Sequence, residues 1–235
     1  MTGVALYVLP VAALVPAFLI AIPVHEMGHA AAVYLLGDRS VRYFGYFTWN
    51  PRRFLDIFGI VAVFIALVGW GRPVPIQSNK IDTTGKKVLR ALGGPAANLV
   101  VGVVLGIVLR LLDSTGFAGR GLTLGAVVEV AVYAIVFLNL SVFAFQLLPV
   151  PGLDGWDIVE ALFRRRNARF FHNVATRRQQ IWIGAVLIIF VGGIFGIRVL
   201  DTVMTPFYEP ASLLADGVCK GYVTGYNAAL WPCLR

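Results

Sequence analysis

Hydrophobic residues in this chain gather into long uninterrupted runs and do not alternate with polar ones. About 20 consecutive apolar residues let a helix cross the ~30 Å hydrocarbon core of a bilayer. Four runs reach that length: residues 4–36, 88–112, 122–150 and 181–199. A fifth run, residues 54–70, is of marginal length. The pattern predicts an all-α polytopic membrane protein with about four to five transmembrane helices.

Composition places the chain in the same class. Of its 235 residues, 58% are hydrophobic and only 14% are charged, which is outside the range of soluble domains. We expect residues 1–200 to form one membrane-embedded domain and residues 201–235 an extracytoplasmic tail. The first run lacks a basic leader and a small-residue cleavage site, so it predicts a retained helix. In the tail, Cys219 and Cys233 are either a disulfide or two free thiols.

The basic residues indicate topology and not a nucleic-acid partner. The formal net charge is +8. Lysine and arginine gather in three loops: Arg39, Arg42, Arg52 and Arg53; Arg72, Lys80, Lys86, Lys87 and Arg90; and the arginines among residues 164–178. The positive-inside rule places all three loops on the cytoplasmic face. The N-terminus, residues 113–120 and the tail are then outside, and the lipid bilayer surrounds the protein.

Residues 54–70 pose a topological problem, because both flanking loops are predicted to be cytoplasmic. A single crossing cannot join two loops on one face. The run is short and contains Asp56, Gly59 and Gly69, so we expect it to enter the membrane region and return, covered there by protein. The alternative is a full span with one basic loop outside.

His25, Glu26 and His29 form an HEMGH motif inside the first apolar run. Positions i and i+4 share one face of a helix, so the two histidines can bind one zinc ion, with Glu26 placed to act on water. The HExxH pattern also arises by chance in soluble helices, but ionisable groups are rare at membrane depth. We therefore predict one zinc site per chain. The third histidine, His172, lies among arginines and is expected to be exposed.

A hydrolytic zinc site takes three protein ligands and leaves a position for water. The best candidate for the third ligand is Asp154, which follows Pro149 and Pro151 at the end of the third long run. Prolines cannot continue the helix, and the break can turn Asp154 back toward the metal. The alternative is that Asp154 caps the following helix, residues 156–163.

Two further segments are expected near the site. Residues 41–49 are rich in aromatic residues around Gly45, which indicates either a β-hairpin or short strand, or an aromatic cluster at the membrane interface. Residues 72–76 contain Pro73 and Pro75, which lack the N–H of a central strand. We expect this segment to be an edge strand or an extended loop beside the active site.

Three motifs in this order resemble the site-2 proteases, the intramembrane zinc metalloproteases of peptidase family M50: HEMGH, the GPAAN of residues 94–98, and the LPVPGLDG of residues 148–155. The TWNP of residues 48–51 and the GWGRPVP of residues 69–75 are similar to the compact bacterial branch without a PDZ domain. The resemblance runs from about residue 24 to 157. Each motif alone is weak, and their common order makes the resemblance specific.

The resemblance implies that His25, His29 and Asp154 ligate zinc and that Glu26 is the general base and later the acid. It also implies a carboxamide eight residues before the aspartate that steadies the oxyanion. The family has asparagine there and this chain has Gln146, which keeps the donor one methylene further out.

The implied function is an intramembrane zinc endopeptidase of the cell membrane. It would cut single-span membrane proteins, or remnants of them, near the cytoplasmic boundary. A catalytically silent scaffold that binds membrane helices is the first alternative, and the glutamine at position 146 supports it. A metal transporter using the same ligands is the second. No residue indicates a particular substrate or an oligomeric state.

Overall fold

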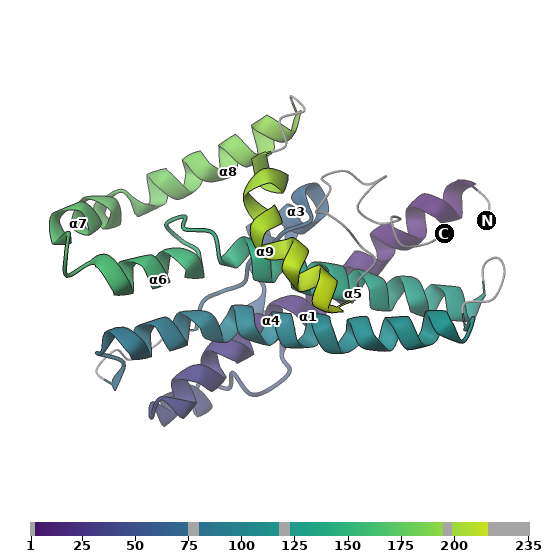
Figure 1. Cartoon of the computed structure of the whole chain (residues 1–235), viewed down its shortest axis with the longest axis horizontal. Coiled ribbons are helices and arrows are strands. Elements are labelled where there is room, and N and C mark those ends of the chain that lie inside the picture. Colours follow the sequence, from purple (N-terminus) through teal and green to yellow (C-terminus); the bar gives the residue numbers. More distant parts are fainter. Residues whose placement is uncertain (1–2, 75–79, 118–122, 195–198, 216–235) are drawn as a thin grey trace.

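Helices build the structure, a computed structural model that describes residues 3–74, 80–117, 123–194 and 199–215 (Figure 1). Within these described ranges, three helices are long and apolar enough to cross a membrane, through Val8–Leu35, Thr84–Leu112 and Leu124–Gln146. In chain order the helices are α1 (Gly3–Leu35), the 3-10 helix η1 (Arg39–Arg42), α2 (Pro51–Phe54), α3 (Ile57–Ala66), α4 (Thr84–Ser114), α5 (Leu124–Gln146), α6 (Asp154–Phe163), α7 (Ala168–Thr176), α8 (Arg178–Ile194) and α9 (Val199–Ala215).

The three long helices α1, α4 and α5 pack against one another and form the centre of the molecule (Figure 1). They correspond to the predicted runs 4–36, 88–112 and 122–150. Leu14 and Ile22 of α1 and Leu138 of α5 are fully buried in their shared core. The all-α membrane class predicted from the apolar runs is therefore confirmed in its main elements.

Glycines let the helices approach α4 closely. A Cβ atom added at Gly28 of α1 would lie 2.4 Å from the carbonyl oxygen of Gly93 on α4. A Cβ atom at Gly106, further along α4, would lie 2.6 Å from the carbonyl oxygen of Ala215 on α9. Small residues at such crossings bring helix backbones together, which is the usual way helices associate in a membrane.

The C-terminal part differs from the prediction. The fourth run forms α8, whose 17 residues rise about 25 Å, so α8 is shorter than the other three apolar helices. Residues 201–215 belong to α9, which packs across α4 and α5 and buries Leu200, Met204 and Tyr208 on one helix face (Figure 1). The division of the chain at residue 200 stays a prediction. The two cysteines lie outside the described residues.

Residues 54–70 enter the fold and return. Leu55 pairs with Gly71 in an isolated antiparallel bridge, and the N–H of Arg72 donates to the carbonyl oxygen of Phe54 at 2.9 Å. Between these ends α3 has ten residues, about 15 Å, and Gly59 lies against the backbone of Trp70. Because the two ends meet, the segment is not a single crossing.

The predicted hairpin in residues 41–49 is wrong. That segment continues from η1 into turns, and Asp38 caps η1 by accepting from the N–H of Ser40 at 3.0 Å. Tyr43 is 89% exposed and Trp49 is 55% exposed, as the aromatic-cluster alternative requires. Residues 72–74 have no regular secondary structure, so the edge strand or extended loop expected there stays a prediction, and residues 75–76 lie outside the described part of the chain.

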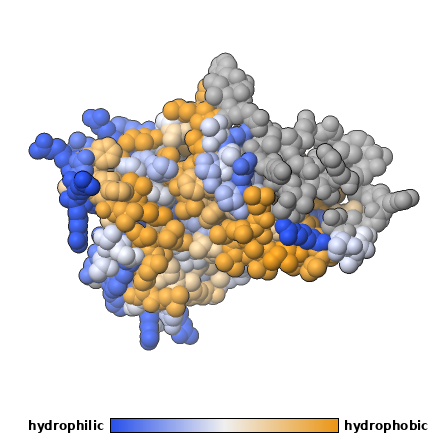
Figure 2. Space-filling view, viewed as in Figure 1, coloured by the Kyte–Doolittle hydropathy of each residue, from blue (hydrophilic) through white to orange (hydrophobic). Residues whose placement is uncertain are grey.

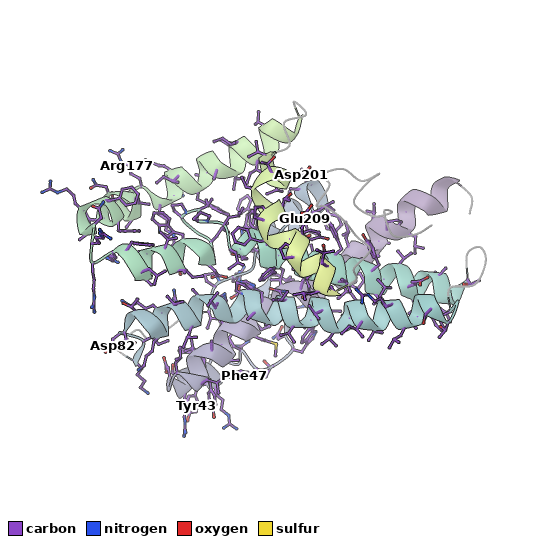
Figure 3. The ribbon with its side chains drawn as sticks, in the orientation of Figure 1. Tyr43, Phe47, Asp82, Arg177, Asp201 and Glu209 are labelled. Carbon is purple, nitrogen blue, oxygen red and sulfur yellow. The ribbon has the colours of Figure 1, made fainter. Side chains whose placement is uncertain are left out.

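Polar and apolar surfaces separate along the molecule. Hydrophilic residues gather at one end, on the left in Figure 2, and apolar residues cover most of the middle in that view. Tyr43 and Phe47 next to the first basic loop, Asp82 in the second and Arg177 in the third all lie toward that end (Figure 3). The three basic loops therefore share one end of the structure.

Candidate metal centre

The three predicted metal ligands meet in space although they come from two helices far apart in sequence. The Nε2 atoms of His25 and His29 are 3.1 Å apart, and each lies 3.1 Å from Oδ2 of Asp154. Both histidines lie on one face of α1, and Asp154 is the first residue of α6. Leu153 is the N-cap of α6 and no side chain caps that helix, so the capping alternative for Asp154 is not what the structure shows.

The loop before α6 turns Asp154 toward α1. Gly152 has φ +118°, a conformation that a residue with a Cβ rarely adopts. A Cβ at Gly155 would lie 2.1 Å from the carbonyl oxygen of Leu147, so the start of α6 folds tightly onto the end of α5. The turn needs glycine at both positions, and Pro149 and Pro151, which precede them, cannot continue the preceding helix.

Asn98 fixes the ring orientation of His25. The amide nitrogen of Asn98 donates to the carbonyl oxygen of Ala21 and to Oδ1 of Asn139, both at 2.9 Å. Oδ1 of Asn98 is therefore the acceptor that faces Nδ1 of His25 at 2.7 Å. Because an amide oxygen cannot donate, His25 carries its proton on Nδ1 and presents Nε2 without one.

His29 is oriented in the same way by the backbone of α4. Its Nδ1 lies 2.9 Å from the carbonyl oxygen of Arg90, which can only accept a hydrogen bond. The N–H of Gly94 also lies 3.3 Å from this nitrogen, but its regular helical acceptor is the carbonyl of Arg90. Because the contact with the carbonyl oxygen of Arg90 is the shorter of the two, we assign the proton of the neutral ring to Nδ1, and Nε2 faces the centre.

The donor set fits a zinc ion. Three electron-pair donors converge on one point. A single proton can bridge only one pair of these atoms, whereas a divalent cation can bind all three. In tetrahedral zinc sites with ligand bonds of ~2.0–2.1 Å, ligand atoms are about 3.3 Å apart, close to the observed spacing. A Cβ at Gly94 would lie 2.5 Å from Nε2 of His29, so glycine keeps this space open. Nitrogen and carboxylate ligands in this number are typical of zinc.

The electrostatic setting keeps the third ligand ionised. Burial raises the pKa of Asp154, but in the metal-free protein the positive charge of protonated His29 and His25 lowers it by more, so the net pKa lies below the usual range. A carboxylate binds metal in its ionised form. Asp154 is therefore in its ligating form at neutral pH.

Glu26 lies beside the three ligands. It is 4% exposed, and its Oε2 is buried with no hydrogen-bond partner among the described residues. A buried carboxylate oxygen without a donor costs free energy unless water or an ion reaches it. Oε1 lies near Gly71, where a Cβ would come within 3.1 Å of it.

All five residues predicted for the site line one cavity of about 620 Å³. Gln146, the last residue of α5, is 6% exposed and lines this cavity together with His25, His29, Glu26 and Asp154. Residues 73–74 form part of one wall, and the junction of α7 and α8 forms another.

Sequence reasoning missed the roles of two residues. Asn98 stands in the GPAAN motif, which helix packing explains equally well, and the role of Arg90 depends on a backbone carbonyl that leaves no signal in the sequence. His172, in contrast, is exposed as predicted.

We predict that His25→Ala and Asp154→Ala each abolish zinc binding, because two ligands cannot hold the ion in a site built for three. Wild type should carry about one zinc per chain. The measurement is zinc per mole of detergent-purified protein. His172→Ala, which removes an exposed histidine, should keep the wild-type content; zinc retained in Asp154→Ala would contradict the three-ligand site.

We also predict that Asn98→Leu weakens zinc binding about 10- to 100-fold, because His25 loses the acceptor that orients its ring. Competition with a chelator measures the affinity. Asn173→Leu, at an exposed position on α7, is the matched control. Equal zinc affinity in the two variants would show that Asn98 only packs helices.

Known proteins resemble the chain in sequence. "Putative zinc metalloprotease YwhC" of Bacillus subtilis is 33% identical over 153 residues, which cover 63% of this chain and 68% of YwhC. "Putative zinc metalloprotease Rip2" of Mycobacterium tuberculosis is 33% identical over 157 residues, 65% of this chain and 58% of Rip2. No family model and no solved structure matches.

The chain thus spans about two thirds of YwhC and a little over half of Rip2. These names agree with the chemistry of the donor set, two histidines and an aspartate around one point with a buried glutamate beside them. The chain belongs to the zinc metalloprotease family of YwhC.

Proposed function

We propose that this chain is an intramembrane zinc endopeptidase of the site-2 protease type, of the compact M50 branch without a PDZ domain. It would hydrolyse peptide bonds in or near the transmembrane segments of membrane proteins. The observation that carries the proposal is the triangle of His25, His29 and Asp154 with Glu26 beside it. The two histidines and Glu26 lie on α1, a helix apolar enough to span a membrane. The relatives' names support the metalloprotease part.

The depth of the site supports cleavage near the cytoplasmic boundary. His25 and His29 lie in the second half of the apolar part of α1, Val8–Leu35. That part of α1 leads to the end of the molecule where the basic loops gather (Figures 1 and 3). By the positive-inside rule this end faces the cytoplasm of a multi-pass protein in the cell membrane.

The residues of the cavity have distinct roles in the proposed hydrolysis. Zinc bound there would polarise the peptide carbonyl and acidify a water molecule. Glu26 takes the proton from the attacking water and passes it to the leaving amine. Its buried Oε2, which has no protein partner among the described residues, is the atom free for this proton. Gln146 donates its amide N–H to the carbonyl oxygen as negative charge develops there.

The substrate must present an extended segment to this cavity. A transmembrane helix hides its peptide bonds in i to i−4 hydrogen bonds, so it has to unwind locally before attack. Gly71, Pro73 and Val74 line the cavity without regular secondary structure beyond the bridge at Gly71, and an extended peptide can pair with an exposed backbone edge of this kind. The proposed substrates are single-span membrane proteins, or the remnants left after an earlier cut.

We predict that Glu26→Gln keeps zinc and lowers the cleavage rate at least about 100-fold, because the amide cannot accept the proton. The assay is cleavage of single-span substrates by protein reconstituted in liposomes, with zinc content measured on the same samples. A Glu26→Gln variant that cleaves like wild type would contradict the proposed mechanism. Zinc-loaded wild type that cleaves no member of a panel of single-span substrates would favour the silent scaffold.

We predict that Gln146→Ala lowers the cleavage rate about 100-fold and leaves zinc affinity unchanged, because the donor to the oxyanion is lost. Gln146→Asn restores the residue common in the family and should retain more activity than Gln146→Ala. The comparison is made at saturating substrate. Equal rates in wild type and Gln146→Ala would remove this residue from the mechanism.

A further inference from the structure

Arg90 touches both halves of the metal centre. Its main-chain carbonyl accepts from Nδ1 of His29 at 2.9 Å, and its guanidinium Nη2 donates to Oδ2 of Asp157 at 2.6 Å. Asp157 follows Asp154 by three residues in α6, and residues three apart share a helix face. One residue of α4 therefore contacts the histidine half directly and the aspartate half through its helix.

We propose that the Arg90–Asp157 pair positions Asp154 against the two histidines. The inference rests on the proposed zinc function. Asp154 arrives on α6, a helix of ten residues that packs against α4 and follows a loop broken by prolines. Metal ligands must be held within about 0.5 Å of their working positions, which a short helix needs external contacts to achieve.

The environment of the pair favours a positioning role over a role in folding. The side chains of Arg90 and Asp157 are 28% and 27% exposed, and partly exposed ion pairs contribute little to overall stability. Both residues line the metal cavity and also a second cavity of about 500 Å³ beside it. Truncating either side chain therefore leaves water-accessible space and no void in the apolar core.

The same helix offers a matched control. Nη1 of Arg164 lies 2.7 Å from Oε1 of Glu160, an ion pair four residues apart near the other end of α6. Neither of these residues lines the metal cavity. A substitution there removes a similar interaction from α6 without touching the metal centre.

The test measures metal binding, without substrate, in full-length protein in detergent. Zinc affinity comes from competition with a chelator, and the absorption spectrum of the cobalt-substituted protein reports the coordination geometry. Arg90→Gln and Asp157→Asn should each weaken zinc about 10- to 100-fold and alter the cobalt spectrum. The zinc affinity of the double variant should be no lower than that of the single variant with the lower affinity, because the two residues act as one unit. Arg164→Gln should match wild type.

Zinc affinity within about two-fold of wild type in both single variants would overturn the inference. It would also be overturned if the variants bind zinc more weakly but keep the wild-type cobalt spectrum, and if the metal-free protein loses as much thermal stability as zinc binding loses free energy. If Arg90→Gln does not fold, the nearly isosteric Asp157→Asn carries the test. If wild type binds zinc but cleaves no substrate, the proposed peptidase function is contradicted and the positioning role is not. If wild type is active and the variants keep the wild-type zinc affinity, only the positioning role is contradicted.

Discussion

Three electron-pair donors held 3.1 Å apart are the constraint on which the rest of the structure depends. Such atoms repel one another unless a positive charge lies between them, so the surrounding protein has to hold each in place. Asn98 and the carbonyl of Arg90 do this for the histidines by accepting hydrogen bonds from their Nδ1–H groups. The glycines around the loop before α6 do it for Asp154. The cost of bringing these groups together explains why so many neighbours are committed to them.

Glycine allows the three long helices to meet this demand. At Gly28 and Gly93 the backbones of α1 and α4 approach so closely that a methyl group would collide with a carbonyl oxygen. That approach brings the carbonyl oxygen of Arg90, near the start of α4, next to His29. Gly94 leaves the space between the two histidines open. Packing and chemistry therefore use the same short stretch of α4.

Much of this arrangement could be predicted from the sequence, because length and hydropathy define membrane helices strongly and the HEMGH spacing defines a helix face. The three long helices follow from such local rules, whereas the pairing of Asp154 with the histidines was expected from the three-ligand rule for zinc and from the family resemblance. The hairpin in residues 41–49 was wrong because aromatic residues mark a strand and a membrane interface equally well, and the cap at Asp38 favours turns. The packing of residues 201–215 depends on contacts with α4 and α5 that no local pattern reveals. The orienting role of Asn98 likewise needs three helices at once.

The separation of the ligands along the chain has a consequence for biosynthesis. His29 and Asp154 are 125 residues apart, and His25 is oriented through a hydrogen-bonded chain that joins α1, α4 and α5. Proteins are synthesised from the N-terminus, so a nascent chain holds both histidines long before α6 emerges. Until then the centre lacks its third ligand, although Asn98, the amide that orients the first, has already been synthesised. A partly synthesised chain that still lacks α6 therefore cannot form the complete metal centre.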